Sequence, residues 1–311
     1  MNETTDDFSR RRFLQSSGAA ALLYALAPAA AATPQATPIK KIISSSGEQL
    51  SVIGLGTSRT FDVDSGGAAQ SPLVEVMQAF FDNGGQLIDS SPMYGSAEAV
   101  TGTLLKSVSN TRGLFTATKV WTNGKDEGIA QMQQSMRRLG VDQIDLMQIH
   151  NLRDWRTHIE TLRDWKQQGK IRYLGITTSH GRYHEELETI LQQQPLDFVQ
   201  FSYNIENRTA ERRLLPLARE HGIATLINRP YQRGSLFRKV RGKPLPDWAA
   251  DFDCASWGQF FLKFIASHPG VTCIIPATSK LKHMVDNMAA GYGRLPDAAT
   301  RQRMIKYLES L

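Results

Sequence analysis

The stretch from Ile144 to Thr177 decides the fold that this sequence predicts. It begins with the apolar run "IDLMQIH" (144–150), continues through "RTHIETLRDWKQQG" (156–169) and ends with a second apolar run, "IRYLGIT" (171–177). Two runs of strand length around a segment with helical spacing, which closes on a glycine, form a β-α-β unit. Such a unit joins two parallel strands by a right-handed crossover.

The same alternation extends outward over most of the chain. Further strand-like runs, each followed by a helical segment, are "LSVIGLG" (50–56), "QLID" (86–89), "GLFTATK" (113–119), "LDFVQFS" (196–202), "IATLIN" (223–228) and "VTCIIP" (271–276). Eight such units predict an α/β fold, a closed (β/α)8 TIM barrel. An open doubly wound sheet is disfavoured because "GLGTS" (54–58) is only a fragment of the glycine fingerprint that such a sheet carries.

Three segments lie outside this repeating pattern. We expect an N-terminal β-hairpin around the turn "SSGEQ" (45–49), in front of the first barrel strand. The segment from Pro230 to Ser256 is rich in glycine, proline and charge, and it predicts a long loop before the seventh helix. A C-terminal helix is expected after the last strand.

The first 32 residues differ in kind from the rest. "SRRRFLQ" (9–15) precedes a mildly apolar, alanine-rich run that ends in small residues. This pattern is typical of a twin-arginine signal peptide, and Pro28 makes the run a poor membrane span. We predict a signal peptide over 1–32, a linker over 33–38 and the barrel over 39–311. The expected partner is the twin-arginine translocation machinery and the expected location is the periplasm or outside the cell; an uncleaved anchor is the alternative.

Bulk composition excludes several classes of function. The chain of 311 residues has a formal net charge of +6, but its basic residues are scattered and form no stripe, so we expect no nucleic-acid partner. Two cysteines, Cys254 and Cys273, exclude a disulfide framework and a four-thiolate metal site.

Polar residues stand at the ends of three successive predicted strands. Asp89, Lys119 and His150 end these strands, and Tyr94 follows in the loop after Asp89. The carboxyl ends of barrel strands surround one mouth, so these four side chains should meet there. A lysine beside the phenol should lower its pKa, so that Tyr94 can donate a proton near neutral pH. The set holds no cluster of metal ligands, and we predict no metal.

These residues belong to seven motifs in order along the chain: "IDSSPMYGSAE" (88–98), "TKV" (118–120), "DLMQIHN" (145–151), "GKIRYLGIT" (169–177), "VQFSYNIENR" (199–208), "LLPLAREHGIATLINRP" (214–230) and "IIPATSKLKHMVDN" (274–287). With them the chain resembles an aldo-keto reductase over nearly all of 39–311. The resemblance implies reduction of an aldehyde or ketone by hydride from NAD(P)H. It also implies that Tyr94 is the general acid, that Lys119 and Asp89 tune it, and that His150 orients the carbonyl.

The resemblance implies a nicotinamide site as well. Gln200 matches the glutamine that binds the carboxamide, Thr177 and Thr178 replace a Ser-Asn pair, and Asn228 replaces a stacking aromatic residue, with Arg229 beside it. The remaining expected contacts lie in a phosphate-binding loop and after the eighth strand, and they are Gly234, Ser235, Leu236, Thr278, Ser279, Lys280, His283 and Asn287. The lysine and two hydroxyl groups in this set favour NADP(H) over NAD(H).

Three apolar residues are candidates for the substrate pocket, namely Met93, Trp121 and Trp248. Ordinary packing explains each of them equally well. The altered nicotinamide contacts leave one alternative function open. In that alternative, the barrel binds a nucleotide as a catalytically weak sensor or interaction subunit.

Overall fold

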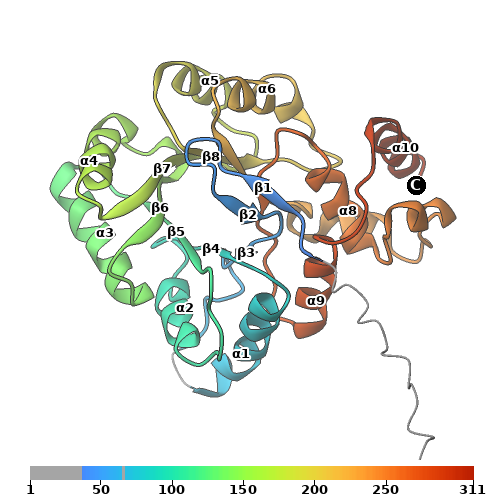
Figure 1. Ribbon diagram of the computed structural model, residues 1–311, viewed down its shortest axis with the longest axis horizontal. Coiled ribbons are helices and arrows are strands. Elements are labelled where there is room, and N and C mark those ends of the chain that lie inside the picture. The colour runs from blue at the N-terminus through green and yellow to red at the C-terminus, as the bar shows by residue number, and fades with distance from the viewer. Residues whose placement is uncertain (1–36, 65–66) are drawn as a thin grey trace, which may run out of the picture. The chain divides into compact units, whose positions relative to one another are not determined.

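Eight parallel strands form the centre of the molecule. The computed structural model describes residues 37–64 and 67–311, so the predicted signal peptide and residues 33–36 of the predicted linker lie outside the described residues. The strands pair in chain order and are β3 (Leu55–Gly56), β4 (Leu87–Asp89), β5 (Phe115–Val120), β6 (Ile144–Ile149), β7 (Ile171–Thr177), β8 (Phe198–Ser202), β9 (Ala224–Asn228) and β10 (Cys273–Ile274). Bridges between Ile53 and Ile274 and between Gly56 and Ala277 close the ring, which confirms the predicted barrel (Figure 1).

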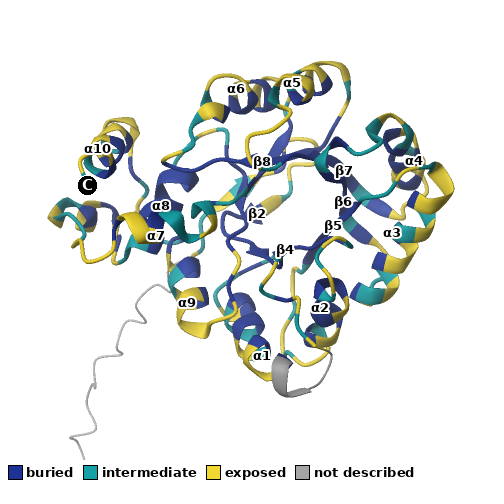
Figure 2. Ribbon diagram, turned by 180° about the vertical axis from the view of Figure 1, so that it is seen from behind, coloured by how far each residue is buried: buried dark blue, intermediate teal, exposed yellow. Residues whose placement is uncertain are grey.

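Helices surround this ring on the outside (Figure 1). They are α1 (Gly67–Asp82), α2 (Ala97–Leu105), α3 (Lys125–Leu139), α4 (Trp155–Gln167), α5 (His184–Gln193), α6 (Leu214–Glu220), α7 (Ser235–Lys239), α8 (Trp257–Ala266), α9 (Leu281–Ala289) and α10 (Ala298–Glu309). Figure 2 shows buried strands inside and helices whose outward faces are exposed. On α4, for example, Ile159, Leu162 and Trp165 are buried, as the helical spacing in the sequence predicts.

A two-stranded hairpin precedes the barrel, as predicted. Its strands β1 (Lys40–Ile42) and β2 (Gln49–Ser51) are antiparallel. Hairpin residues Ile43 and Leu50 join an apolar cluster with Phe115 and Phe198, which begin barrel strands, so the hairpin closes the amino-terminal end. The segment "LSVIGLG" was expected to form one strand, but it is divided between β2 and β3 because the chain must leave the hairpin to enter the barrel.

The segment from Pro230 to Ser256 has more regular structure than a loop. It contains α7 and two turns of 3-10 helix, η3 (Gln232–Gly234) and η4 (Asp247–Phe252). The expected C-terminal helix is α10, whose Asp297 side chain caps it by accepting a hydrogen bond from the Thr300 backbone N–H at 2.8 Å. No helix among the described residues is both long enough and apolar enough to cross a membrane.

The inward-facing side chains of the barrel change from apolar to polar along the strands. Phe115 and Ala117 belong to the apolar cluster inside the barrel, and Lys119, two residues further along β5, faces the same interior. On β6 the corresponding sequence is Leu146 followed by Gln148. The barrel is therefore apolar at the hairpin end and polar where the strands finish.

Candidate active site

A buried ion pair lies at the carboxyl end of β4 and β5. The Lys119 ammonium donates to Asp89 Oδ2 at 2.6 Å and to the Ser90 carbonyl oxygen at 2.7 Å. Lys119 is 0% exposed and Asp89 2%. Two buried charges are tolerable when they neutralise each other and carry further hydrogen bonds. Burial lowers the pKa of Lys119, but Asp89 and Tyr94 outweigh it, so the pKa is raised and the ammonium stays charged.

Two glutamines complete the surroundings of the carboxylate. Gln148 Nε2 donates to Asp89 Oδ1 at 2.9 Å, and Gln200 Nε2 donates to the same oxygen at 3.1 Å. Gln200 was predicted only as a nicotinamide contact, and Gln148 was not singled out from the sequence. Its signal was present, because a polar residue two positions before His150 on an apolar strand faces the same interior.

Tyr94 lies beside this pair, in the loop after β4. The Lys119 ammonium is 5.0 Å from the centre of the phenol ring. Gly95, which follows, has a φ of 60°, and Ser96 is held by hydrogen bonds to Asp62. Burial raises the pKa of Tyr94 above its ordinary value, although Lys119 acts in the opposite direction. The prediction that the phenol pKa would be lowered is therefore wrong in its net direction. Tyr94 is a protonated phenol at neutral pH.

His150 contributes a neutral ring to the same mouth. Its ring lies edge-on to Tyr94, with 5.8 Å between ring centres, and its Nδ1 is 3.0 Å from the buried Ser91 hydroxyl. Burial, aided by the charge of Lys119, lowers the pKa of His150 to about 3. The imidazole is thus uncharged across the physiological range, so it can form hydrogen bonds but is not an acid there.

This pKa shift has a consequence for stability. A folded-state pKa of about 3, below the ordinary 6.5, means that the unfolded chain binds the extra proton between these values. The stabilising contribution of the neutral ring is therefore complete above about pH 6.5 and is lost as the pH falls toward 3. Between pH 7 and pH 5 we expect the wild type to lose about 2 kcal/mol of unfolding free energy more than His150→Gln. Denaturant titration at both pH values measures this, and equal losses would contradict it.

The predicted nicotinamide contacts meet at the ends of β7, β8 and β9. Asn228 Nδ2 donates to the Thr178 carbonyl oxygen at 3.0 Å and lies 3.4 Å from Gln200 Oε1. Thr177 Oγ1 accepts the Asn151 backbone N–H at 3.3 Å. The Thr178 hydroxyl is buried and has no hydrogen-bond partner among the described residues. A buried hydroxyl without a partner can form a hydrogen bond with a polar group of a ligand.

Positive charge collects at the same end of the barrel. Arg229 follows β9 and contacts the His180 ring after β7. Burial, with the charges of Arg233, Arg182 and Arg59, lowers the pKa of Arg229 to about 10. These four arginines have no carboxylate partner among the ion pairs of the described residues. Only Arg229 was predicted from the sequence. The other three arginines lie in the loops after β3, β7 and β9. Because these loops are far apart in the sequence, the sequence alone did not indicate that the arginines form a cluster.

The predicted phosphate-binding loop follows directly. Gly234 has a φ of 86°, which glycine adopts without strain, and Ser235 Oγ donates to the Gln232 carbonyl oxygen at 2.9 Å. Leu236 is fully buried, so its side chain belongs to the core.

The segment after β10 presents a second group of predicted contacts. Lys280, Ser279 and His283 are exposed, whereas Thr278 is buried and its hydroxyl accepts the Lys280 backbone N–H at 3.1 Å. Burial and the neighbouring Lys282 and Lys280 lower the pKa of His283. Asn287 Oδ1 accepts a hydrogen bond from the Tyr231 hydroxyl at 2.6 Å, which ties this segment to the loop after β9.

Two of the three candidate pocket residues lie near the candidate catalytic residues. The Trp121 ring is 6.5 Å from the His150 ring, and Met93 is 47% exposed in the Tyr94 loop. Trp248 packs elsewhere, against Phe252, Phe260 and Tyr307. Its interpretation as a pocket wall is thus replaced by ordinary packing between η4, α8 and α10.

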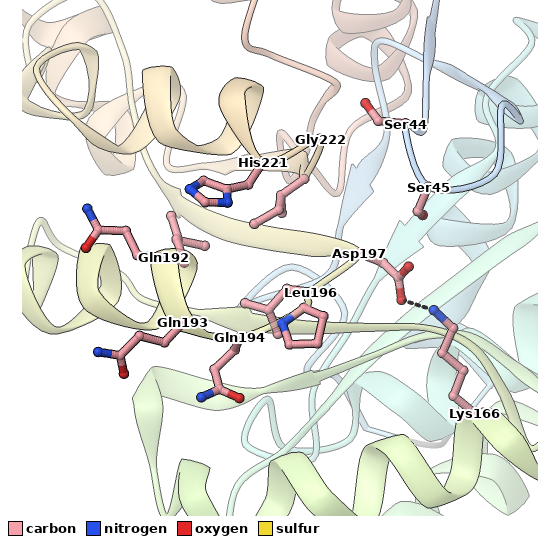
Figure 3. Close-up of a pocket in the computed structure, with 13 residues that line it drawn as sticks. Ser44, Ser45, Lys166, Gln192, Gln193, Gln194, Leu196, Asp197, His221 and Gly222 are labelled. Atoms are coloured by element: carbon pink, nitrogen blue, oxygen red, sulfur yellow. Dashed lines mark hydrogen bonds and ion pairs between the residues drawn. The ribbon is translucent and has the colours of Figure 1, made fainter.

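A groove of about 550 Å³ lies at the other end of the barrel, where the strands begin (Figure 3). Lys166 and Asp197 pair across it at 2.6 Å, and Asp197 also accepts the Leu174 backbone N–H. Since these charges satisfy each other, we assign the groove no ligand. Among residues 37–64 and 67–311, no three acidic, histidine or cysteine side chains group as metal ligands.

Comparison with known proteins matches this chain to one family. Residues 52–302 match the model of the aldo/keto reductase family. The aldo-keto reductase YhdN of Bacillus subtilis is 30% identical over 213 residues, which cover 64% of this chain and 63% of YhdN, less than two thirds of that relative's length. Methylglyoxal reductase YeaE of Escherichia coli is 26% identical over 256 residues, covering 80% of this chain and 89% of YeaE.

Solved structures share the fold. An aldo/keto reductase from Klebsiella pneumoniae in complex with NADP and acetate has a TM-score of 0.73 at 23% identity, covering 87% of this chain and 95% of that one. The thermostable aldo-keto reductase Tm1743, in complex with the inhibitor epalrestat, has a TM-score of 0.70 at 25% identity, covering 88% and 99%.

Proposed function

Because this chain belongs to the aldo/keto reductase family, we propose that it reduces a small aldehyde or ketone to the alcohol with NADPH as hydride source. The observation that carries the proposal is the buried Lys119–Asp89 pair beside Tyr94, with the neutral His150 ring against the same phenol. This arrangement supplies a proton donor and a hydrogen-bond donor to one oxygen atom. A barrel that only binds a nucleotide has no use for it.

The described residues fit a nicotinamide cofactor. Gln200, Thr178 and Asn228 would hold the carboxamide, and the unpartnered Thr178 hydroxyl is the observation that favours this placement. Bound NADPH supplies a hydride to the carbonyl carbon. Arg229 and the three arginines around it would bind the phosphates, because an anion there relieves the repulsion between these like charges.

The protein's own groups act on the carbonyl oxygen. His150 donates a hydrogen bond that orients the carbonyl and stabilises negative charge on its oxygen as the charge forms. Tyr94 then transfers its hydroxyl proton to that oxygen. Lys119 stabilises the resulting phenolate, and Asp89 keeps the ammonium in place. In the balanced reaction the carbonyl carbon gains the hydride and the oxygen gains the proton of Tyr94, which solvent restores.

Lys280 is proposed to favour NADPH over NADH by contacting the 2′-phosphate. We expect Lys280→Ala to raise the Kd for NADPH about fivefold and to leave the Kd for NADH nearly unchanged, since one charge-assisted hydrogen bond is lost. Fluorescence titration measures both constants. Lys282→Ala is the matched control, because it removes the same charge two residues away and should have a smaller effect. An equal effect of Lys280→Ala on both nucleotides would contradict the assignment.

The proposal as a whole is tested by nucleotide titration followed by turnover. The full chain is titrated with NADPH and NADH, then assayed with a panel of aromatic and aliphatic aldehydes. NADPH binding with aldehyde-dependent oxidation of the cofactor supports the reductase. Tight binding without turnover on any aldehyde would favour the sensor alternative. Absence of nucleotide binding would mean that Thr178 and Asn228 do not make a working site.

We also propose that the protein is exported by the twin-arginine route to the periplasm or beyond. The support is the sequence "SRRRFLQ" (9–15) and the alanine-rich run that follows it. Fractionation of cells that produce the full chain, beside a variant with Arg10, Arg11 and Arg12 replaced by lysine, tests this. Retention of the wild type in the cytoplasm would contradict it.

A further inference from the structure

The Ser91 hydroxyl links the Tyr94 loop to the His150 ring. Its oxygen lies 3.0 Å from His150 Nδ1 and accepts the Met93 backbone N–H at 3.2 Å. Ser91 is 0% exposed and His150 5%, so water does not compete freely for these bonds. The contact is between side chains 59 residues apart, and it fixes the ring from the side opposite to Nε2.

The count of protons decides which ring nitrogen is protonated. The Met93 N–H always donates, so it occupies one lone pair of the Ser91 oxygen. The hydroxyl proton then needs an acceptor, and among the described residues the only one within hydrogen-bond distance is His150 Nδ1. If Nδ1 carried a proton, the Ser91 oxygen would accept hydrogen bonds from both His150 Nδ1 and the Met93 N–H. The hydroxyl proton of Ser91 would then be buried without an acceptor. An unmade buried hydrogen bond of this kind is costly.

The tautomer matters because the ring is neutral. The lowered pKa of His150 removes the doubly protonated form at neutral pH, so only one nitrogen can donate. Nε2 has no hydrogen-bond partner among the described residues. With the proton on Nε2 the ring donates into the mouth. With the proton on Nδ1 it would present a lone pair to a carbonyl oxygen and repel it.

We infer that Ser91 is a positioning residue: its hydroxyl donates to Nδ1, holds His150 in the Nε2–H form and so makes the ring a hydrogen-bond donor to the substrate carbonyl. The choice between the two neutral tautomers follows from the geometry of the Ser91 contacts. Its effect on turnover rests on the proposed reductase function.

Nitrogen NMR of the histidine-labelled full chain tests the tautomer directly. The chain has 7 histidines, and the His150 signals are identified by their loss in His150→Gln. We expect an unprotonated Nδ1 and a protonated Nε2 in the wild type and in Ser91→Thr, which keeps the hydroxyl. Ser91→Ala should shift the proton wholly or partly to Nδ1. Ser90→Ala is the matched control, because that buried hydroxyl is adjacent but bonds to Thr57 instead.

Kinetics supply the second measurement. In Ser91→Ala we expect kcat for aldehyde reduction to fall about five- to tenfold, with recovery in Ser91→Thr. A wild-type ring protonated on Nδ1, or a Ser91→Ala ring with an unchanged tautomer, would overturn the inference. If the tautomer responds as expected but the wild type reduces no aldehyde, the proposed function fails while the role of Ser91 in fixing the ring stands.

Discussion

Tyr94→Phe is expected to lower kcat for aldehyde reduction by roughly 10³-fold while changing the Kd for NADPH less than twofold. The substitution deletes one oxygen. Among the described residues the other hydroxyl against His150 is that of Ser91, which lies 3.0 Å from Nδ1. Among the described residues the phenol is the candidate acid beside the ion pair, because the pKa of His150 is too low for an acid at neutral pH. Steady-state assays and fluorescence titration of the same preparation measure the two quantities.

A second tyrosine provides the control for this substitution. Tyr183, in the loop after β7, is 53% exposed. Tyr183→Phe removes an equivalent hydroxyl from the same end of the barrel, and we expect it to keep at least half of the wild-type kcat. If Tyr94→Phe retained a comparable rate, Tyr94 would not be the acid. Loss of NADPH binding in Tyr94→Phe would instead show that the phenol serves the cofactor.

Lys119→Met should damage both stability and catalysis. The methionine leaves Asp89 buried at 2% exposure with only two amide donors, Gln148 and Gln200, and no opposite charge. Removing one partner of a buried ion pair costs about 3–5 kcal/mol. We therefore expect a loss of that size in denaturant titration, together with loss of measurable turnover in the fraction that remains folded.

A buried lysine elsewhere separates the two effects. Lys263 in α8 is also 0% exposed, but its ammonium donates to the backbone carbonyl oxygens of Tyr292 and Arg294. Lys263→Met should lower stability and leave the kcat of the folded protein close to that of the wild type. Equal loss of activity in both variants would mean that Lys119 acts only through folding. A Lys119→Met protein as stable as the wild type would contradict the account of the ion pair.

Most of the barrel could be predicted from the sequence because the patterns that indicate its strands and helices lie in short, continuous segments. Runs such as "IDLMQIH" show strand length and position, and helical spacing shows the buried face of α4. The division of "LSVIGLG" between hairpin and barrel could not be read locally. It depends on Ile43 and Leu50 packing against the ends of distant strands.

The grouping of the candidate residues at one end of the barrel was predictable for a topological reason. Asp89, Lys119 and His150 end parallel neighbouring strands, and parallel strands place such ends together. The sign of the Tyr94 pKa shift was not predictable, since it depends on how far burial outweighs Lys119. The roles of Ser91 and Trp248 were also not predictable from the sequence. Ser91 resembles an ordinary loop serine until its contact with His150 is known, and Trp248 resembles a pocket residue until its packing against Tyr307 is known.

Transfer of isotope from cofactor to substrate tests the central claim most directly. The full chain is incubated with an aromatic aldehyde and NADPH in which both hydrogens at the reactive carbon of the nicotinamide are deuterium, and the alcohol is analysed by mass spectrometry. Hydride transfer in the site formed by Tyr94, Lys119 and His150 predicts one deuterium on the alcohol carbon, and Tyr94→Phe is expected to transfer it roughly 10³-fold more slowly. Bound NADPH with no labelled alcohol from any aldehyde would contradict the account.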